Sequence, residues 1–145
     1  MKRALIVFLT AVFIGILFHP VTAKAASEEE ILELLNYARS QAGLDEVSYD
    51  ASLASVAQTR ARECATRFSH TRPNGQSWQT VSSITNGENL AHAVNCNQSQ
   101  PENVVLAWLL SPTHKANVMR SSFTSVGIAY YYSETGETYI VAEFN

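Results

Sequence analysis

The stretch AWLLSPTHKAN (residues 107–117) decides how this chain folds, because it contains the end of one predicted helix and the start of the next. Pro101 suits the first position of the earlier helix, and apolar residues follow it at helical spacing. Ser111 is expected to cap a short second helix whose first turn contains His114. His114 and Asn117 are three residues apart and therefore lie on one helical face. The stretch thus presents an imidazole and an amide side by side.

Two segments upstream carry side chains of the same chemical kinds. FSHTRPNG (68–75) places His70 in a loop with proline and glycine, just after a helix predicted from Asp50 to Phe68. A loop or short strand is expected around Trp78, followed by a turn at Gly87, and GENLA (87–91) places Glu88 directly after that turn. Two imidazoles and a carboxylate can bind a metal ion, transfer protons or brace a groove by hydrogen bonding. The candidate groove residues are His70, Glu88, His114 and Asn117.

The remaining elements predict an α+β domain. Ser27 and Glu30 form a capping box before a stripe of apolar residues at helical spacing, and Gly43 ends that helix. Residues 123–132 and 138–144 are rich in β-branched and aromatic residues and flank a turn with a glycine, which predicts a hairpin. Helices followed by a hairpin indicate a layered α+β fold.

The N-terminus has the pattern of a secretory signal. Lys2 and Arg3 precede an apolar run over residues 4–18, and a small-x-small triplet follows at residues 23–25. The run is shorter than the roughly 20 residues of a membrane span, although an uncleaved anchor is the alternative. We therefore expect a signal peptide at 1–25, cleavage after Ala25, and a secreted single domain at 26–145 with no integral membrane segment.

Charge argues against a nucleic-acid partner. The chain has 10 basic and 13 acidic residues. Loss of residues 1–25 removes Lys2, Arg3 and Lys24, so 10 − 3 leaves 7 basic residues and a formal charge of 7 − 13 = −6. The remaining lysines and arginines are scattered, whereas binding to a phosphate backbone needs them clustered.

The two cysteines, Cys64 and Cys96, both lie in the exported part. An oxidising compartment favours a disulfide between them. For a loop of this length, the loss of chain entropy in the unfolded state would stabilise the fold by roughly 3 to 4 kcal/mol. Two separate thiols are the alternative.

Four segments in register carry a family resemblance: FSHTRPNG (68–75), GENLA (87–91), AWLLSPTHKAN (107–117) and FTSVGIAYY (123–131). Together they resemble the CAP superfamily, or SCP domain, which includes cysteine-rich secretory proteins, antigen 5 and plant pathogenesis-related proteins. The similarity is closest to the short bacterial secreted branch and spans residues 31–144.

The resemblance implies an α-β-α sandwich with a small central antiparallel sheet and a groove that holds two histidines and two acids. His70 matches the first histidine, Glu88 the first acid and His114 the second histidine. The place of the second acid, between Trp108 and His114, holds no acidic residue.

Several functions fit this groove. The favoured interpretation is an extracellular binding module for a divalent cation such as zinc, held by His70 and His114 with Glu88 as a third ligand or as a partner that orients them. A small lipid, a peptide or a cell-envelope component is the other kind of ligand that we expect. The alternative is a metal-assisted hydrolase with Glu88 or a histidine as general base, and a purely bracing polar cluster also fits. His92, after GENLA, is expected at the groove rim or in an exposed loop. The sequence does not decide whether the protein is an enzyme.

Overall fold

The computed structural model describes residues 23–145, so the predicted signal peptide lies outside the described residues apart from its last three positions. The elements, in chain order, are α1 (Ala23–Gln41), β1 (Ser48–Tyr49), α2 (Ala51–Thr66), the 3-10 helix η1 (Trp78–Val81), β2 (Gly87–Ala93), α3 (Pro101–Leu110), α4 (Pro112–Val118), β3 (Ser125–Tyr132) and β4 (Thr138–Phe144). Within this range, no helix is long and apolar enough to span a membrane.

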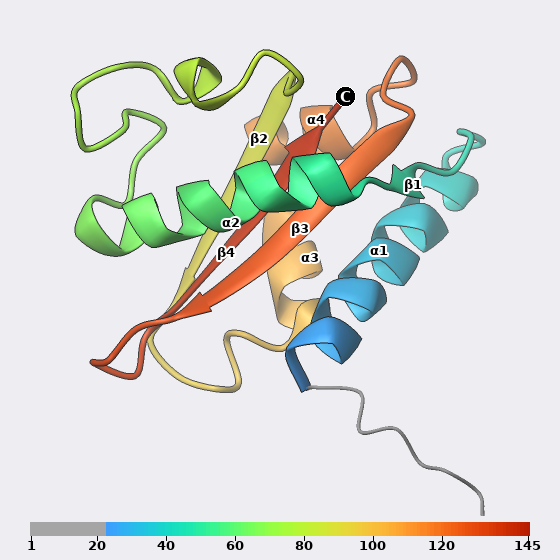
Figure 1. The fold of residues 1–145 in the computed structure, drawn as a ribbon. Coiled ribbons are helices and arrows are strands. Elements are labelled where there is room, and N and C mark those ends of the chain that lie inside the picture. Colours follow the sequence, from blue (N-terminus) through green and yellow to red (C-terminus); the bar gives the residue numbers. More distant parts are fainter. Residues whose placement is uncertain (1–22) are drawn as a thin grey trace, which may run out of the picture.

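The fold is the predicted α+β sandwich around a small sheet. The strand order is β1-β3-β4-β2, in which β4 pairs antiparallel with both β3 and β2, while the two-residue β1 runs parallel to β3. Helix α2 crosses one face of the sheet, and α1, α3 and α4 cover the other face (Figure 1). The predicted fold class is confirmed.

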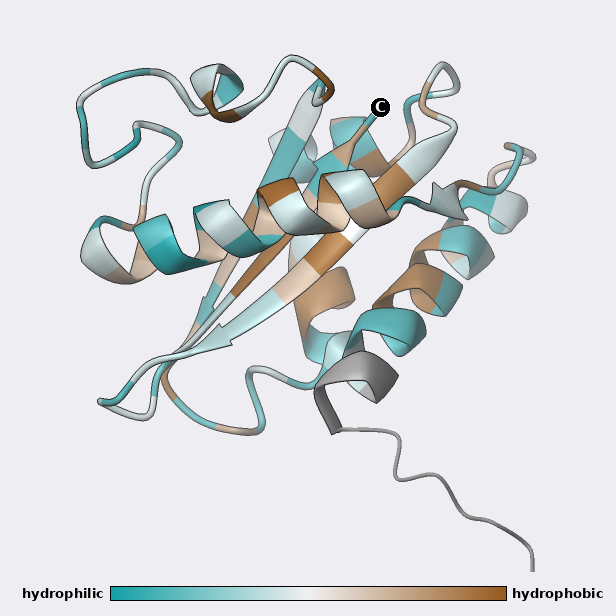
Figure 2. Ribbon diagram, in the orientation of Figure 1, coloured by the Kyte–Doolittle hydropathy of each residue, from teal (hydrophilic) through white to brown (hydrophobic). Residues whose placement is uncertain are grey.

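Strand alternation divides the interior into two apolar layers. Ile128, Ile140 and Phe144 point toward α1, α3 and α4, where they pack in one apolar cluster with Trp108 of α3. Their neighbours Ala129 and Val141 point toward α2. Ala57, Ala61 and Cys64 of α2 pack in this second layer, and Figure 2 shows apolar residues along α2 and the strands behind it.

Helix α2 lies unusually close to β3. Asp50 caps the helix by accepting hydrogen bonds from the backbone N–H groups of Ser52 and Leu53, as the sequence predicted. Opposite the first turn stands Gly127, where an added Cβ would lie 2.0 Å from the backbone nitrogen of Ala54. A glycine at this position therefore sets the distance between helix and sheet.

Three expectations for secondary structure are corrected. The segment that begins at Gly87 is strand β2 rather than a turn, and it forms one edge of the sheet. Helix α1 begins at Ala23, before the predicted cap at Ser27. The segment around Trp78, expected as a loop or short strand, is a 3-10 helix.

The predicted Cys64–Cys96 disulfide is not formed, because both cysteines are free. Cys64 is buried between α2 and the sheet, whereas Cys96 is exposed. Cys96 lies on the connection from β2 to α3, and α3 covers the opposite face of the sheet from α2. The fold thus directs the two thiols to different environments.

Candidate functional site

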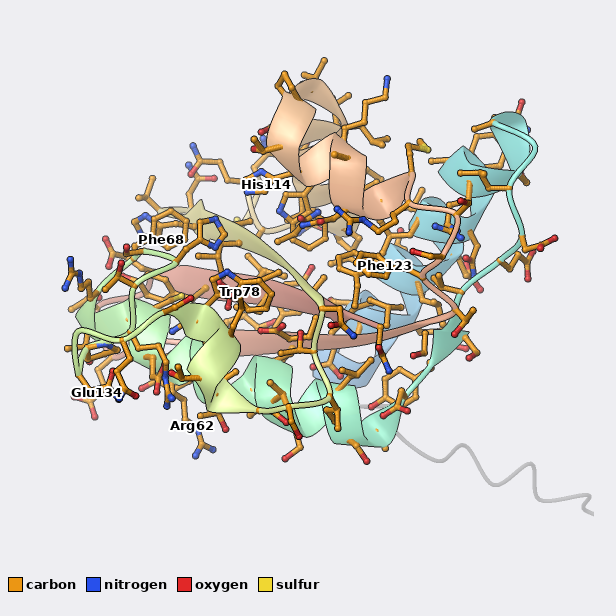
Figure 3. All side chains as sticks on the ribbon, turned by 90° about the horizontal axis from the view of Figure 1, so that it is seen from above. Arg62, Phe68, Trp78, His114, Phe123 and Glu134 are labelled. Atoms are coloured by element: carbon orange, nitrogen blue, oxygen red, sulfur yellow. The ribbon has the colours of Figure 1, made fainter. Side chains whose placement is uncertain are left out.

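A cavity of about 460 Å³ opens between α4, β2 and the segment that contains η1. Its lining residues are His70, Trp78, Asn86, Gly87, Glu88, Thr113, His114, Asn117 and Arg120. All four candidate groove residues are among them, so the structure brings together side chains from three separate segments. Figure 3 shows His114 on the α4 side of this groove and Trp78 on the facing segment.

Amide side chains fix α4 against β2. Asn117 donates from Nδ2 to the backbone oxygen of Glu88 at 3.1 Å and to Oδ1 of Asn89 at 2.9 Å. Asn89 in turn donates to the backbone oxygen of His114 at 3.1 Å. Asn117 therefore lines the groove and also positions the wall that carries His114.

Gly87 allows this close approach of α4 and the following loop. An added Cβ at Gly87 would lie 2.8 Å from ring atoms of Phe123 and 3.2 Å from Oδ1 of Asn117. The Phe123 ring also stacks on Phe144 at the end of β4. The glycine of the GENLA segment is thus required by packing on the groove floor.

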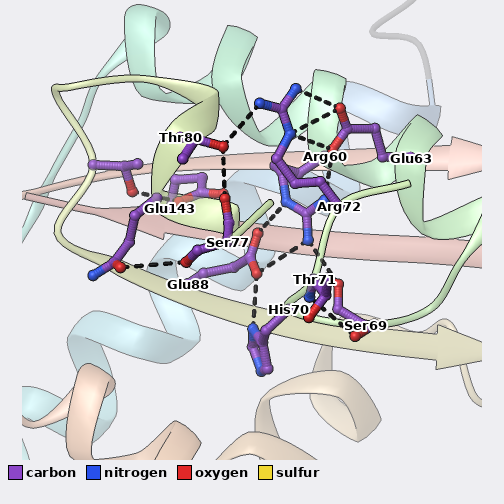
Figure 4. A network of polar contacts seen from close by, with 12 residues as sticks. Arg60, Glu63, Ser69, His70, Thr71, Arg72, Ser77, Thr80, Glu88 and Glu143 are labelled. Atoms are coloured by element: carbon purple, nitrogen blue, oxygen red, sulfur yellow. Dashed lines mark hydrogen bonds and ion pairs between the residues drawn. The ribbon is translucent and has the colours of Figure 1, made fainter. Parts of the chain in front are cut away.

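Glu88 is the centre of a buried hydrogen-bond network (Figure 4). Arg60 of α2 donates from Nε to Oε2 of Glu88 at 2.6 Å and from Nη2 to Oε1 at 3.3 Å. Nδ1 of His70 lies 2.8 Å from Oε1 of the same carboxylate. Both oxygens of Glu88 are therefore occupied by Arg60 and His70.

This network sets the charge of Glu88. Burial alone would raise the pKa of the Glu88 carboxyl, but hydrogen bonds from His70 and Arg60 outweigh burial and lower it. Burial likewise opposes the charge of Arg60, and the hydrogen bonds and charge of Glu88 raise the pKa of the guanidinium. The pair is therefore ionised, and Nδ1 of His70 donates its proton to the carboxylate.

A second ion pair supports the loop that carries His70. Glu63 accepts from Nη1 of Arg60 at 2.6 Å and from Nη2 of Arg72 at 2.6 Å. Arg60 also donates to the backbone oxygen of Ser69 at 2.8 Å. The fully buried Arg60 thus fixes the Glu88 carboxylate and the loop at the same time.

Sequence reasoning missed Arg60 and Glu143. Glu143 lies directly opposite Glu88 in the β2–β4 register and is fully buried. Thr85 donates a hydrogen bond to Oε2 of Glu143, whereas Oε1 has no hydrogen-bond partner among the described residues. Burial and the nearby charge of Glu88 raise the pKa of Glu143 to about 9. No acid lies at residues 109–112, so the second carboxyl group near this site comes from β4. The sequence signal that could have identified Glu143 is the presence of an acid inside the otherwise apolar segment TYIVAEF.

His70 and His114 face each other across the groove. Their ring centroids are 6.2 Å apart with an interplanar angle of 53°. Half of the His70 side chain is exposed. Burial, followed by the charge of His70, lowers the pKa of His114. His114 is therefore neutral at pH 7 and has lone-pair nitrogen available.

The residues fit a metal held by two histidines better than one held by three protein ligands. Among the described residues, no group of three or more His, Cys, Asp or Glu side chains is arranged to hold a metal ion. With Nδ1 of His70 bound to Glu88, the Nε2 atom of neutral His70 presents its lone pair outward. Glu88 then acts as the carboxylate that orients a ligating histidine. The other coordination positions would be filled from outside the protein.

His92 does not belong to this site. It lies on β2 rather than in a loop, does not line the cavity, and stacks on Tyr139 with centroids 4.7 Å apart. Its Nε2 lies 3.6 Å from Oε1 of Glu137. His92 therefore lies neither at the groove rim nor in a loop, the two positions expected for it.

The chain belongs to the CAP family. The model of the cysteine-rich secretory protein family matches residues 32–144. The uncharacterized protein YkwD of Bacillus subtilis (strain 168) is 31% identical over 114 residues, which cover 73% of this chain and 43% of that protein. The chain thus spans less than half the length of this curated relative.

Solved structures support the same fold. An extracellular SCP-domain protein of Bacillus anthracis has a TM-score of 0.67 at 21% identity, covering 87% of this chain and 44% of that one. A structure of NaASP2 with Zn²⁺ has a TM-score of 0.64 at 16% identity, covering 82% of this chain and 78% of that one.

Proposed function

We propose that this protein is a secreted, extracellular CAP-domain binding module whose groove holds a divalent cation such as zinc between His70 and His114. One observation carries the proposal. The Arg60–Glu88 pair fixes Nδ1 of His70, so that the other ring nitrogen is presented toward the groove that His114 lines. A neighbour of the same fold, NaASP2, was solved with Zn²⁺. The cation would offer open coordination positions to an extracellular ligand.

The hydrolase alternative has weaker support. A general base must have a lone pair directed at the attacking water. Both oxygens of Glu88 accept hydrogen bonds from Arg60 and His70, and the side chain is buried. Glu88 is therefore better suited to orienting His70 than to removing a proton from substrate.

Zinc titration by calorimetry tests the proposal on the wild type and three variants. His70→Ala and His114→Ala each remove a proposed ligand and should abolish most of the affinity. Glu88→Gln should lower the affinity by about 10- to 100-fold, the usual effect of losing a carboxylate that orients a ligating histidine. His92→Ala removes a histidine outside the groove and serves as the matched control.

The pH dependence adds a second check. Zinc binds the neutral imidazole, and the lowered pKa of His114 keeps this ring neutral below the ordinary histidine range near 6.5. The contribution of His114 should therefore persist down to a lower pH than that of an unperturbed histidine. Absence of saturable zinc binding to folded wild type, or an equal loss in His92→Ala, would remove the metal from the proposed function.

A further inference from the structure

Arg120 places an unneutralised cation at the proposed metal groove. The residue is exposed and lines the cavity, and its guanidinium carbon lies 5.0 Å from the centroid of the Phe123 ring. Within residues 23–145, no hydrogen bond or ion pair engages the guanidinium. Arg39, Arg60 and Arg72 are in contrast occupied by backbone carbonyls or carboxylates. The donors of Arg120 are thus available to a ligand.

The position of Arg120 is set by the groove floor. Phe123, over which the guanidinium lies, packs against Gly87 and stacks on Phe144. A cation held over an aromatic face loses little freedom when it binds an anion, because its side chain is already placed. This contact keeps the charge beside the groove rather than free in solvent.

The other charges of the groove leave room for one negative charge. Glu88 is the only carboxylate among the lining residues, and the guanidinium of Arg60 already neutralises it. Arg120 is the only arginine or lysine among the lining residues, and no carboxylate within residues 23–145 pairs with its guanidinium. A single guanidinium matches a carboxylate, which it binds through two parallel hydrogen bonds, whereas a phosphate dianion would leave one charge unmatched.

Trp78 supplies an apolar wall beside this cation. Its ring is half-buried, lines the cavity and has no hydrogen bond to its indole N–H within the described part of the chain. An indole carries a donor and a broad apolar face. A carboxylate with a short organic body thus meets complementary chemistry on both sides of the groove.

We propose that the groove binds a monoanionic carboxylate, the group found at the C-terminus of a peptide, with Arg120 as its principal partner and Trp78 as the adjoining wall. The inference rests on the proposed function for the site, since a carboxylate oxygen would also fill an open position on a cation at His70 and His114. The contact with Arg120 itself does not require the metal.

N-acetylglycine is a suitable probe, because it carries one carboxylate on a small peptide-like body and does not absorb where tryptophan is excited. Its binding is followed by tryptophan fluorescence, with and without zinc. Trp108 is fully buried and donates to the backbone oxygen of Leu90 at 3.0 Å, so the response should come from Trp78. N-acetylglycinamide, which lacks the charge, and inorganic phosphate are the comparison ligands.

Arg120→Gln should weaken N-acetylglycine binding by about 10- to 100-fold, as expected for hydrogen bonds to a charged group. Arg62→Gln removes the same charge from an exposed position on α2, away from the groove in Figure 3, and should change the affinity by less than about twofold because solvent ions screen it. The effect of Arg120 should appear with and without zinc, and the wild type should bind more tightly with zinc.

The inference is overturned if N-acetylglycine does not saturate the wild type in either state, or if Arg62→Gln weakens binding as much as Arg120→Gln. It is also overturned if N-acetylglycinamide or phosphate binds at least as tightly as N-acetylglycine. A protein that binds no zinc but binds N-acetylglycine through Arg120 would contradict the metal in the proposed function and support the carboxylate site. The two proposals can therefore fail separately.

Discussion

Arg60 determines what Glu88 does in this groove, because it pairs with the buried carboxylate. His70, Glu88 and His114 stand in distinctive local settings, and the structure brings them together at one cavity. The role of Glu88 depends on Arg60, 28 residues earlier, which donates to it from the buried side of α2. Arginines on helices are usually exposed, so nothing in the sequence distinguished Arg60 from Arg62. Partners that meet only in the folded chain were the part that the sequence did not reveal.

Glu143 should make stability depend on pH in the direction opposite to an ordinary ion pair. Its pKa is about 9 in the folded protein, above the usual value of 4.5. Between these two pH values the folded state binds a proton that the unfolded state has released, so the free energy of unfolding falls as pH rises. The limiting slope for one proton is about 1.4 kcal/mol per pH unit. Glu143→Gln, which stays neutral, should remove this fall.

Urea unfolding at pH 5 and at pH 8 measures the difference. Wild type should lose more stability between these conditions than Glu143→Gln does. Glu134→Gln, exposed between β3 and β4, provides the control and should follow the wild type. Parallel curves for all three proteins would show that Glu143 ionises normally in the fold.

Elements with local start signals were predicted well, whereas those held by distant contacts were not. Helices α2 and α3 begin where Asp50 and Pro101 indicated. Strand β2 was missed because Gly87, Glu88 and Asn89 are poor strand formers. Their polar groups are satisfied by α2, the His70 loop and α4 rather than by neighbours in sequence. The helix and sheet layers therefore stabilise a strand that its own residues disfavour.

The contact between α2 and β3 gives a sharp prediction at the level of elements. In Gly127→Ala the new methyl group would lie 2.0 Å from the nitrogen of Ala54 and 2.1 Å from the carbonyl carbon of Leu53, so α2 must move away from the sheet. Such overpacking against backbone should cost about 3 kcal/mol or more. Chemical denaturation measures the loss, with Ser55→Ala, exposed on α2, as a control that should stay within about 0.5 kcal/mol. A variant as stable as wild type would show that α2 is not held at this distance.

At the scale of the whole molecule, the domain is held by two apolar layers without a covalent link between its cysteines. The predicted export and the presence of two cysteines favoured a disulfide, but composition carries no information on which layer each thiol joins. The sheet separates the helix that carries Cys64 from the helix that follows Cys96. Pairing of cysteines thus depended on topology that the local sequence signals did not specify.

Thiol labelling distinguishes the two cysteines and reports on global unfolding. Without reductant, native protein treated with iodoacetamide should gain one label, because Cys96 is exposed while Cys64 is buried and burial raises the pKa of its thiol to about 11. Urea should expose Cys64 and allow the second label.

The rate at which Cys64 is labelled under native conditions reports on opening of the fold. Because Cys64 lies under α2 in the apolar layer, it should react only in the transiently open state, at a rate proportional to the population of that state. Gly127→Ala, which lifts α2, should accelerate labelling at Cys64 and leave Cys96 unchanged. Intact-mass analysis counts the labels, and a chain that gains none in urea until reductant is added would establish the disulfide instead.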